Sequence, residues 1–255
     1  MSIGGLVAGK ALDLAVDHAL DGAIGVAIAK ASKYRSQRFI EALINAVRLE
    51  LDHDVSEDEL NELLAKLANK TNSEAVFDSC RRACLSRSRE IGPRVIALLT
   101  AVLLSEERGP NDEEKMILDV AERLNDGELE EVVATIRQWE QELLDQSPKM
   151  QQRYGELHMK VDQVDLDDRH QGVVETGSRL IAVLGALGER LRSCGLVDEY
   201  MEQSRIHWRA DSERYIDEDG SATRTIWIIV FKVGYRSLAD YIERAQRAIV
   251  ASTLE

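Results

Sequence analysis

The sequence contains few cysteines, prolines and aromatic residues, and each scarcity excludes a class of protein. Of its 255 residues, three are Cys and three are Pro, and 5% are aromatic. An odd, low number of cysteines argues against a disulfide-stabilised scaffold and suits a reducing compartment. So few prolines leave room for long uninterrupted helices. The apolar fraction of 44% is enough to bury a core, so global disorder is excluded.

Long apolar runs are also missing, even in the most apolar region, residues 3–31. Its longest uncharged stretch, residues 22–29, is far shorter than the roughly 20 residues that a membrane-spanning helix needs. Nothing basic precedes Ile3, whereas a secretory signal begins with basic residues. We therefore expect a cytoplasmic protein.

Basic residues are outnumbered by acidic ones. The chain has 32 Lys and Arg against 46 Asp and Glu, which gives a net charge of −14. This field repels phosphate, so we do not expect nucleic acid as a partner.

Helical periodicity dominates residues 1–148. One example is the stripe of apolar residues on a single face formed by Leu129, Val132, Val133, Ile136 and Trp139. Pro93 fits the first turn of a helix over residues 95–104, where its missing N–H had no intrahelical partner. We predict an all-helical bundle here.

The periodicity changes after Pro148, and residues 149–255 are predicted to form a small α+β domain in the order β-α-β-β-α. Residues 157–161 alternate as in a strand, and residues 225–231 are the strongest strand signal in the chain. A helical seam between them ends at Cys194 and Gly195, and an amphipathic helix follows Ser237. The predicted fold class is therefore mainly α, with a helical bundle followed by this α+β domain.

An acidic turn at residues 105–114 separates two of the predicted helices. It lacks the alternating oxygen ligands of an EF-hand, and helix capping accounts for its composition. The layout of residues 95–124 is superficially similar to the TerB-like helical domains of tellurite-resistance and stress proteins, but it lacks their Ala-Asp-Gly core. The similarity implies no site residues in this chain.

Small residues form a ridge along the predicted first helix. A helix could approach this ridge closely, and we take the following residues as a candidate helix-association face: Gly5, Gly9, Ala15, Ala19, Ala23 and Ala27. Two interpretations stay open. The helix is either buried in the bundle, or it detaches to self-associate or to act on a membrane through residues 3–31.

Five arginines stand out against the acidic background and form a candidate patch for an anion or a protein partner: Arg81, Arg82, Arg87, Arg89 and Arg94. The alternative is that they pair with the acidic stretch at residues 106–114. No aromatic residues are interleaved with them, which does not support a nucleic-acid groove.

Metal and cofactor motifs are weak or missing. The weak metal candidates are two histidines and two nearby acids, His158, Asp165, Asp168 and His170, and their spacing matches no helical ligand pair. The alternative is a solvated acidic loop, with His158 pointing to solvent. Cys80 and Cys84 are predicted to be buried small apolar residues. The sequence contains no catalytic constellation, and we expect no cofactor.

Three functional hypotheses follow, in order of preference. The first is a non-enzymatic cytosolic protein that acts through a protein partner or self-association, in a bacterial stress or phage-defence pathway. The second is a membrane-acting effector that uses residues 3–31. The third is a metal-dependent enzyme with its site in the C-terminal domain.

Overall fold

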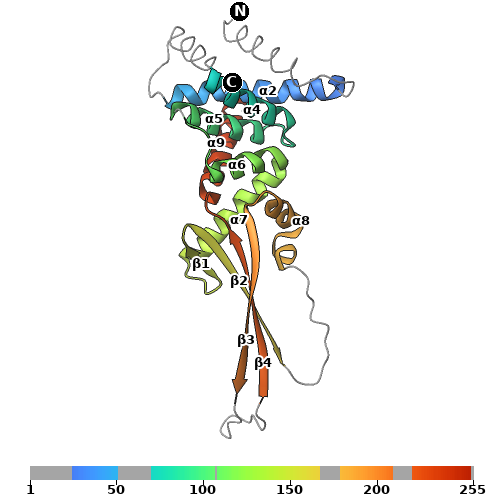
Figure 1. Cartoon of the computed structure of the whole chain (residues 1–255), viewed down its shortest axis with the longest axis vertical. Coiled ribbons are helices and arrows are strands. Elements are labelled where there is room, and N and C mark those ends of the chain that lie inside the picture. Colours follow the sequence, from blue (N-terminus) through green and yellow to red (C-terminus); the bar gives the residue numbers. More distant parts are fainter. Residues whose placement is uncertain (1–24, 51–69, 107, 167–178, 209–219, 254–255) are drawn as a thin grey trace, which may run out of the picture. The chain divides into compact units, whose positions relative to one another are not determined.

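A computed structural model describes residues 25–50, 70–106, 108–166, 179–208 and 220–253 of the chain (Figure 1). The chain divides into two compact units. Unit 1 comprises Met1–Thr135 and Arg236–Glu255, and unit 2 comprises Ile136–Tyr235.

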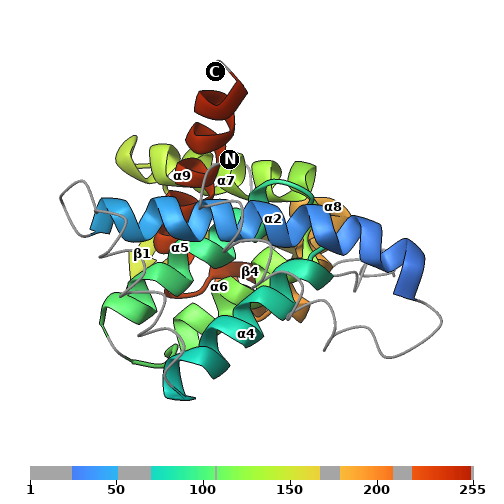
Figure 2. The ribbon, with the colours of Figure 1, turned by 90° about the horizontal axis from the view of Figure 1, so that it is seen from above.

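All regular secondary structure among the described residues of unit 1 is helical. Its helices are α2 (Gly25–Glu50), α4 (Lys70–Leu85), α5 (Ile91–Ser105), α6 (Asp112–Arg123), the first half of α7 (Asp126–Leu144) and most of α9 (Tyr235–Thr253). Figure 2 shows α2 lying across α4 and α5. The predicted periodicity is confirmed where α2 buries Phe39 and Leu43.

Helix α5 is the most apolar of these helices and is buried along nearly its whole length. Pro93 occupies its first turn, as predicted. Gly92 allows α5 to approach α6 closely, because a Cβ at this position would lie 2.4 Å from the carbonyl oxygen of Ala121.

Reciprocal hydrogen bonds cap the next two helices. At the start of α6, the Asn111 side chain accepts the N–H of Glu114, whose carboxylate accepts the N–H of Asn111. Asn125 and Glu128 repeat this arrangement at the start of α7. Capping therefore explains the acidic turn, as predicted.

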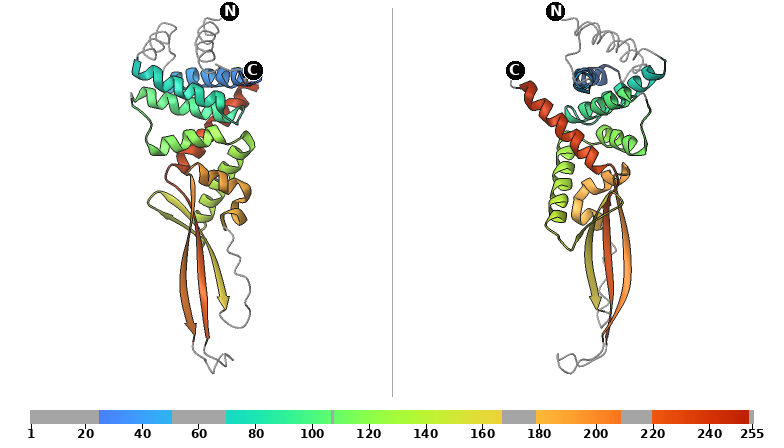
Figure 3. Two further views of the ribbon diagram at one scale, coloured as in Figure 1. Left: turned by 45° about the vertical axis from the view of Figure 1, so that its right-hand side comes forward. Right: turned by 90° about the vertical axis from the view of Figure 1, so that its left-hand side faces the viewer.

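Unit 2 contains a four-stranded antiparallel sheet in the order β1-β2-β4-β3 (Figure 3). Its strands are β1 (Met150–Arg153), β2 (Glu156–Leu166), β3 (Val197–Trp208) and β4 (Gly220–Phe231). The last strand in the chain, β4, is central and pairs with β2 on one side and β3 on the other.

One face of this sheet is covered by helices at one end, and we call it the helix-covered face. The Trp139 ring of α7 packs edge-on against Phe231 at 5.0 Å. Helix α8 (Arg179–Ser193) contacts β3 and β4, and the backbone N–H of its Leu180 donates to Glu199 at 2.8 Å. The strands β2, β3 and β4 continue past α8 (Figure 3).

Helix α8 is kinked at Gly185, whose φ of 58° and ψ of −150° are not helical. This conformation is almost restricted to glycine. Gly188, in the turn after the kink, packs tightly, since a Cβ there would lie 2.9 Å from Leu180 Cγ.

The predicted fold class is confirmed: the chain is mainly α, with helices followed by a small α+β region. The element order differs from the prediction in one respect, because β1 precedes β2. The predicted boundary between domains 1–148 and 149–255 stays a prediction. Within the described part of the chain, no helix combines the length and the apolar character that a bilayer crossing requires.

Candidate functional site

Three of the five candidate arginines have carboxylate partners within unit 1. Arg81 pairs with Asp78 at 2.8 Å. Arg82 contacts the same Asp78 and also Asp119, at 2.7 Å, and so connects α4 to α6. Glu122 is a third partner of Arg82 at 3.1 Å. The partners lie outside residues 106–114, so the alternative pairing proposed above is wrong for these two arginines.

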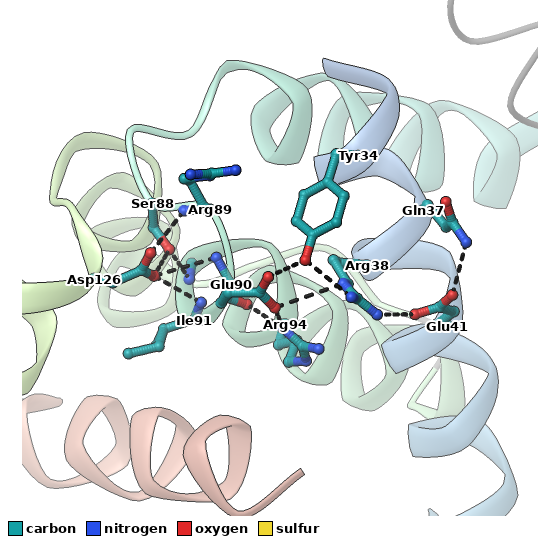
Figure 4. A network of polar contacts seen from close by, with 11 residues as sticks. Tyr34, Gln37, Arg38, Glu41, Ser88, Arg89, Glu90, Ile91, Arg94 and Asp126 are labelled. Atoms are coloured by element: carbon teal, nitrogen blue, oxygen red, sulfur yellow. Dashed lines mark hydrogen bonds and ion pairs between the residues drawn. The ribbon is translucent and has the colours of Figure 1, made fainter. Parts of the chain in front are cut away.

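Arg94 belongs to a separate polar network between α2 and α5, shown in Figure 4. Its guanidinium forms an ion pair with Glu90. Glu90 also accepts a hydrogen bond from the Tyr34 hydroxyl, and Arg38 donates to that hydroxyl at 2.9 Å. The Arg38 guanidinium lies over the Tyr34 ring, 4.8 Å from its centre.

These contacts lower the pKa of the Glu90 carboxyl. Burial alone would raise it, but hydrogen bonds from Tyr34 and Arg94 and the charge of Arg38 outweigh that effect. Glu90 is therefore ionised at neutral pH and holds α2 against the start of α5.

Asp126 completes the network at the N-terminus of α5 (Figure 4). Its carboxylate accepts hydrogen bonds from the Ser88 hydroxyl and from the backbone N–H groups of Arg89, Glu90 and Ile91. Burial raises its pKa, but these four donors lower it by more, so the net shift is downward. Negative charge at this position also stabilises the helix dipole.

The candidate arginine patch is therefore divided by local structure. Arg81, Arg82 and Arg94 bind acids of the same unit, whereas the side chains of Arg87 and Arg89 are exposed in the segment between α4 and α5. Sequence reasoning missed Tyr34, Arg38 and Asp126, because each has a partner 35 to 56 residues away along the chain, which is Glu90 for the first two and Ile91 for Asp126.

Cys80 and Cys84 are both buried in α4, as predicted. A hydrogen bond from the Cys80 thiol lowers the pKa of Cys84, as do a hydrogen bond from Ser36 and the charge of Arg35, although burial opposes the shift. The pKa of Cys80 is raised by the same hydrogen bond and by burial. Cys84 is therefore the first of the two thiols to ionise.

His158 is buried, with 6% of its surface exposed, so the prediction that it points to solvent is wrong. Its Nε2 lies 3.2 Å from Glu156, and its Nδ1 lies 3.3 Å from the Tyr200 hydroxyl. Burial raises the pKa of Tyr200, and the charge of Glu202 adds to this. The phenol is thus held in its neutral, hydrogen-bonding form.

The other metal candidates do not join His158 in the structure as described. Asp168 and His170 lie outside the described residues, and Asp165 is described only as a backbone position in β2. Among the described side chains, no group of three or more His, Cys, Asp or Glu residues is arranged to hold a metal ion.

The predicted helix-association face lies almost entirely outside the described residues. This applies to Gly5, Gly9, Ala15, Ala19 and Ala23. Ala27 lies in the first turn of α2, and its side chain is not described. Both interpretations of residues 3–31 stay predictions.

A surface that the sequence reasoning did not single out lies on the helix-covered face of the sheet. The strand register places residues of this face in three successive rows, Leu157–Phe231–Val197, Met159–Ile229–Glu199 and Val161–Trp227–Met201. We call the third of these the apolar row. Its Val161 and Trp227 are half-buried, and Met201 is 47% exposed.

The apolar row ends at the outer edge of the sheet. Strand β3 is last in the sheet order, so it pairs only with β4 among the described strands. The Leu196 carbonyl accepts the N–H of Lys232, the residue after β4, at 2.8 Å. An antiparallel strand bonds its neighbour at alternate residues, so Leu196 and every second residue after it direct their backbone groups to β4. The residues between them, Glu199, Met201 and Gln203, direct their backbone groups to the open side, and the Glu199 N–H accordingly donates to the side chain of Asp198 at 2.9 Å and not to β4.

No protein-family model matches the chain, and neither a curated protein nor a solved structure shows significant similarity to it. The geometry described above is therefore the basis for functional inference.

Proposed function

We propose that the chain is a non-enzymatic cytosolic protein that acts through protein–protein interaction, with the outer edge of β3 as its contact surface. The supporting observation is that the apolar row Val161–Trp227–Met201 ends at β3, which pairs with only one other strand among those that the structure describes. Exposed apolar side chains beside the outer edge of a sheet form a template for an added strand.

Exposure of the neighbouring side chains also supports this surface. Tyr200 is 42% exposed and Met201 47%, and Glu202, Gln203 and Ser204 after them are exposed as well. Large side chains that lie open on adjacent positions of one edge strand are a hazard for aggregation unless a partner covers them.

The pathway in which the protein acts and the two alternative functions stay predictions. A stress or phage-defence pathway rests on the helical layout of residues 95–124. The membrane-acting alternative rests on residues 3–31, of which 3–24 lie outside the described residues. The metal-dependent alternative rests on the acidic region near His170, where residues 167–178 lie outside them.

Site-specific photo-crosslinking in living cells tests the proposal. A benzophenone amino acid replaces Met201 in the full chain, and the matched control carries it at Gln152, which is exposed on β1 at the opposite edge of the sheet. We expect a discrete adduct from position 201, identified by mass spectrometry, and none from position 152. The absence of any protein adduct at 201 would contradict the proposed contact surface.

A further inference from the structure

We infer that the open edge of β3 pairs with β3 of a second copy of this chain, antiparallel and with Met201 at the twofold axis. The inference rests on the proposed function, because it presupposes that this edge is a protein contact surface. It adds the identity of the partner and the register of pairing.

The direction of the backbone groups limits the registers. The backbone groups of Glu199, Met201 and Gln203 point to the open side. Two copies can therefore form hydrogen bonds only where one of these residues lies opposite one of the same three in the second copy. Twofold axes at residues 200, 201 and 202 satisfy this condition near the centre of the exposed stretch.

Charge selects one of these three registers. An axis at Tyr200 places Asp198 opposite Glu202 of the second copy, and an axis at Glu202 places that acid opposite itself. Like charges directly opposite one another destabilise strand pairing. An axis at Met201 places Glu199 opposite Gln203, Tyr200 opposite Glu202 and Asp198 opposite Ser204, so no acid lies directly opposite another, and acids meet only as the more distant diagonal neighbours.

The same register extends the apolar row. Met201 lies at the edge end of Val161–Trp227–Met201, and an axis through it places the second copy's row directly in line with the first. The 47%-exposed Met201 side chains then cover each other on the helix-covered face. The pairing therefore removes the most exposed apolar side chain of this row from water.

Pairing also changes one hydrogen bond of the edge. In the single chain, the Glu199 N–H donates to the Asp198 carboxylate. In the dimer, that N–H donates to the Gln203 carbonyl of the second copy. The Asp198 carboxylate, which also pairs with Lys232 at 3.6 Å, then lies opposite the Ser204 hydroxyl. The Glu199 N–H thus exchanges one acceptor for another.

Sedimentation velocity on the full chain tests the partner. We expect the wild type to associate reversibly to a dimer. Met201→Lys should weaken that association roughly tenfold or more, because it places two ammonium groups side by side at the axis. Gln152→Lys, which adds the same charge at the other edge, should leave it unchanged. Far-UV circular dichroism checks that both variants fold.

Disulfide crosslinking with oxidised glutathione tests the register. Met201→Cys places two thiols in a pair with about 5.5 Å between Cα atoms, within the range of a disulfide. Ser204→Cys places them six residues apart along the strands, about 20 Å, which is out of reach. The three native cysteines are buried. We expect the first variant to crosslink and the second to stay reduced.

The outcomes separate this inference from the proposed function. A monomeric wild type, a Met201→Lys variant that associates like the wild type, or crosslinking of Ser204→Cys in place of Met201→Cys would overturn the inference. If the wild type is monomeric but position 201 crosslinks to a different protein in cells, the proposed function stands and only the self-pairing is wrong. If neither result is obtained, both fail.

Discussion

The carboxylate of Asp126 accepts the backbone N–H of Ile91 at 2.9 Å, across 35 residues of chain. Asp126 is the first residue of α7, and Ile91 is the first residue of α5. The start of one helix is thereby capped by the start of another. The residue at the N-cap of α5, Glu90, makes no capping hydrogen bond with its side chain, which pairs with Arg94 instead.

Replacing Asp126 should destabilise the protein. Asp126→Ala leaves the first backbone donors of α5 without their acceptor, and we expect a loss of about 1–2 kcal/mol in the free energy of unfolding. The matched control is Asp112→Ala in the first turn of α6, because the Asp112 side chain is 98% exposed. Its effect should stay within about 0.5 kcal/mol. Urea unfolding followed by circular dichroism measures both, and equal losses would contradict the capping role.

The contribution of Asp126 should depend on pH. Its folded-state pKa lies below the ordinary value of about 3.9, so its stabilisation is complete well above that value and is lost as the pH falls through the folded-state pKa. The difference in urea midpoint between wild type and Asp126→Asn should therefore narrow as the pH falls from 7 towards 3. Both proteins contain the same other acids, so the comparison isolates the effect of Asp126. A difference in urea midpoint that stays constant with pH would show that ionisation of Asp126 does not stabilise the fold.

Gly185→Ala should destabilise unit 2 by about 1–3 kcal/mol, because φ and ψ at this kink are strained for any residue with a Cβ. All three tryptophans lie within residues 136–235, so tryptophan fluorescence reports the unfolding of this unit. Gly127→Ala serves as the control in the first turn of α7. It should be neutral or stabilising by up to about 1 kcal/mol, since a Cβ there makes only an ordinary contact with Asn125 at 3.5 Å.

Arg82→Met should cost about 1–2 kcal/mol, because it removes the ion pairs to Asp119 and Glu122 and leaves those acids without their shared cation. Methionine keeps an apolar side chain like the stem of arginine, so the loss in the free energy of unfolding measures the contribution of the charge. Arg87→Met, at an exposed position of the following segment, should change stability by less than about 0.5 kcal/mol. Thermal unfolding at low and high salt measures both. If Arg87→Met proved the more damaging variant, the assigned pairing would be wrong.

Local signals in the sequence were enough to predict much of the secondary structure. Pro93 located the start of α5, and the run of apolar residues 225–231 located β4, because both signals depend on near neighbours in the chain. Strand β1 was missed for a physical reason. It is four residues long and mostly polar, and the turn that joins it to β2 places the non-glycine residue Tyr154 at a positive φ of 51°.

The side-chain environments were harder to predict. Alternation in β2 placed His158 on the face opposite Met159, which suggested exposure to solvent. The start of β2 is buried on both faces, since Leu157 and His158 are both below one-tenth exposed and Tyr200 of β3 reaches His158. The partners of Arg82 likewise lie 37 and 40 residues away. Such pairings depend on how distant segments meet, which periodicity does not encode.

The central position of β4 constrains the order in which the sheet can be built. Strands β2 and β3 come first in the chain, yet each pairs with β4 and neither pairs with the other. On the ribosome, the sides of β2 and β3 that face β4 therefore lack their partner strand until residues 220–231 have emerged, although β2 can already pair with β1. Chaperones that bind extended segments would find β2 and β3 available throughout that interval, and a stop in translation before Gly220 would leave a fragment that cannot form this sheet.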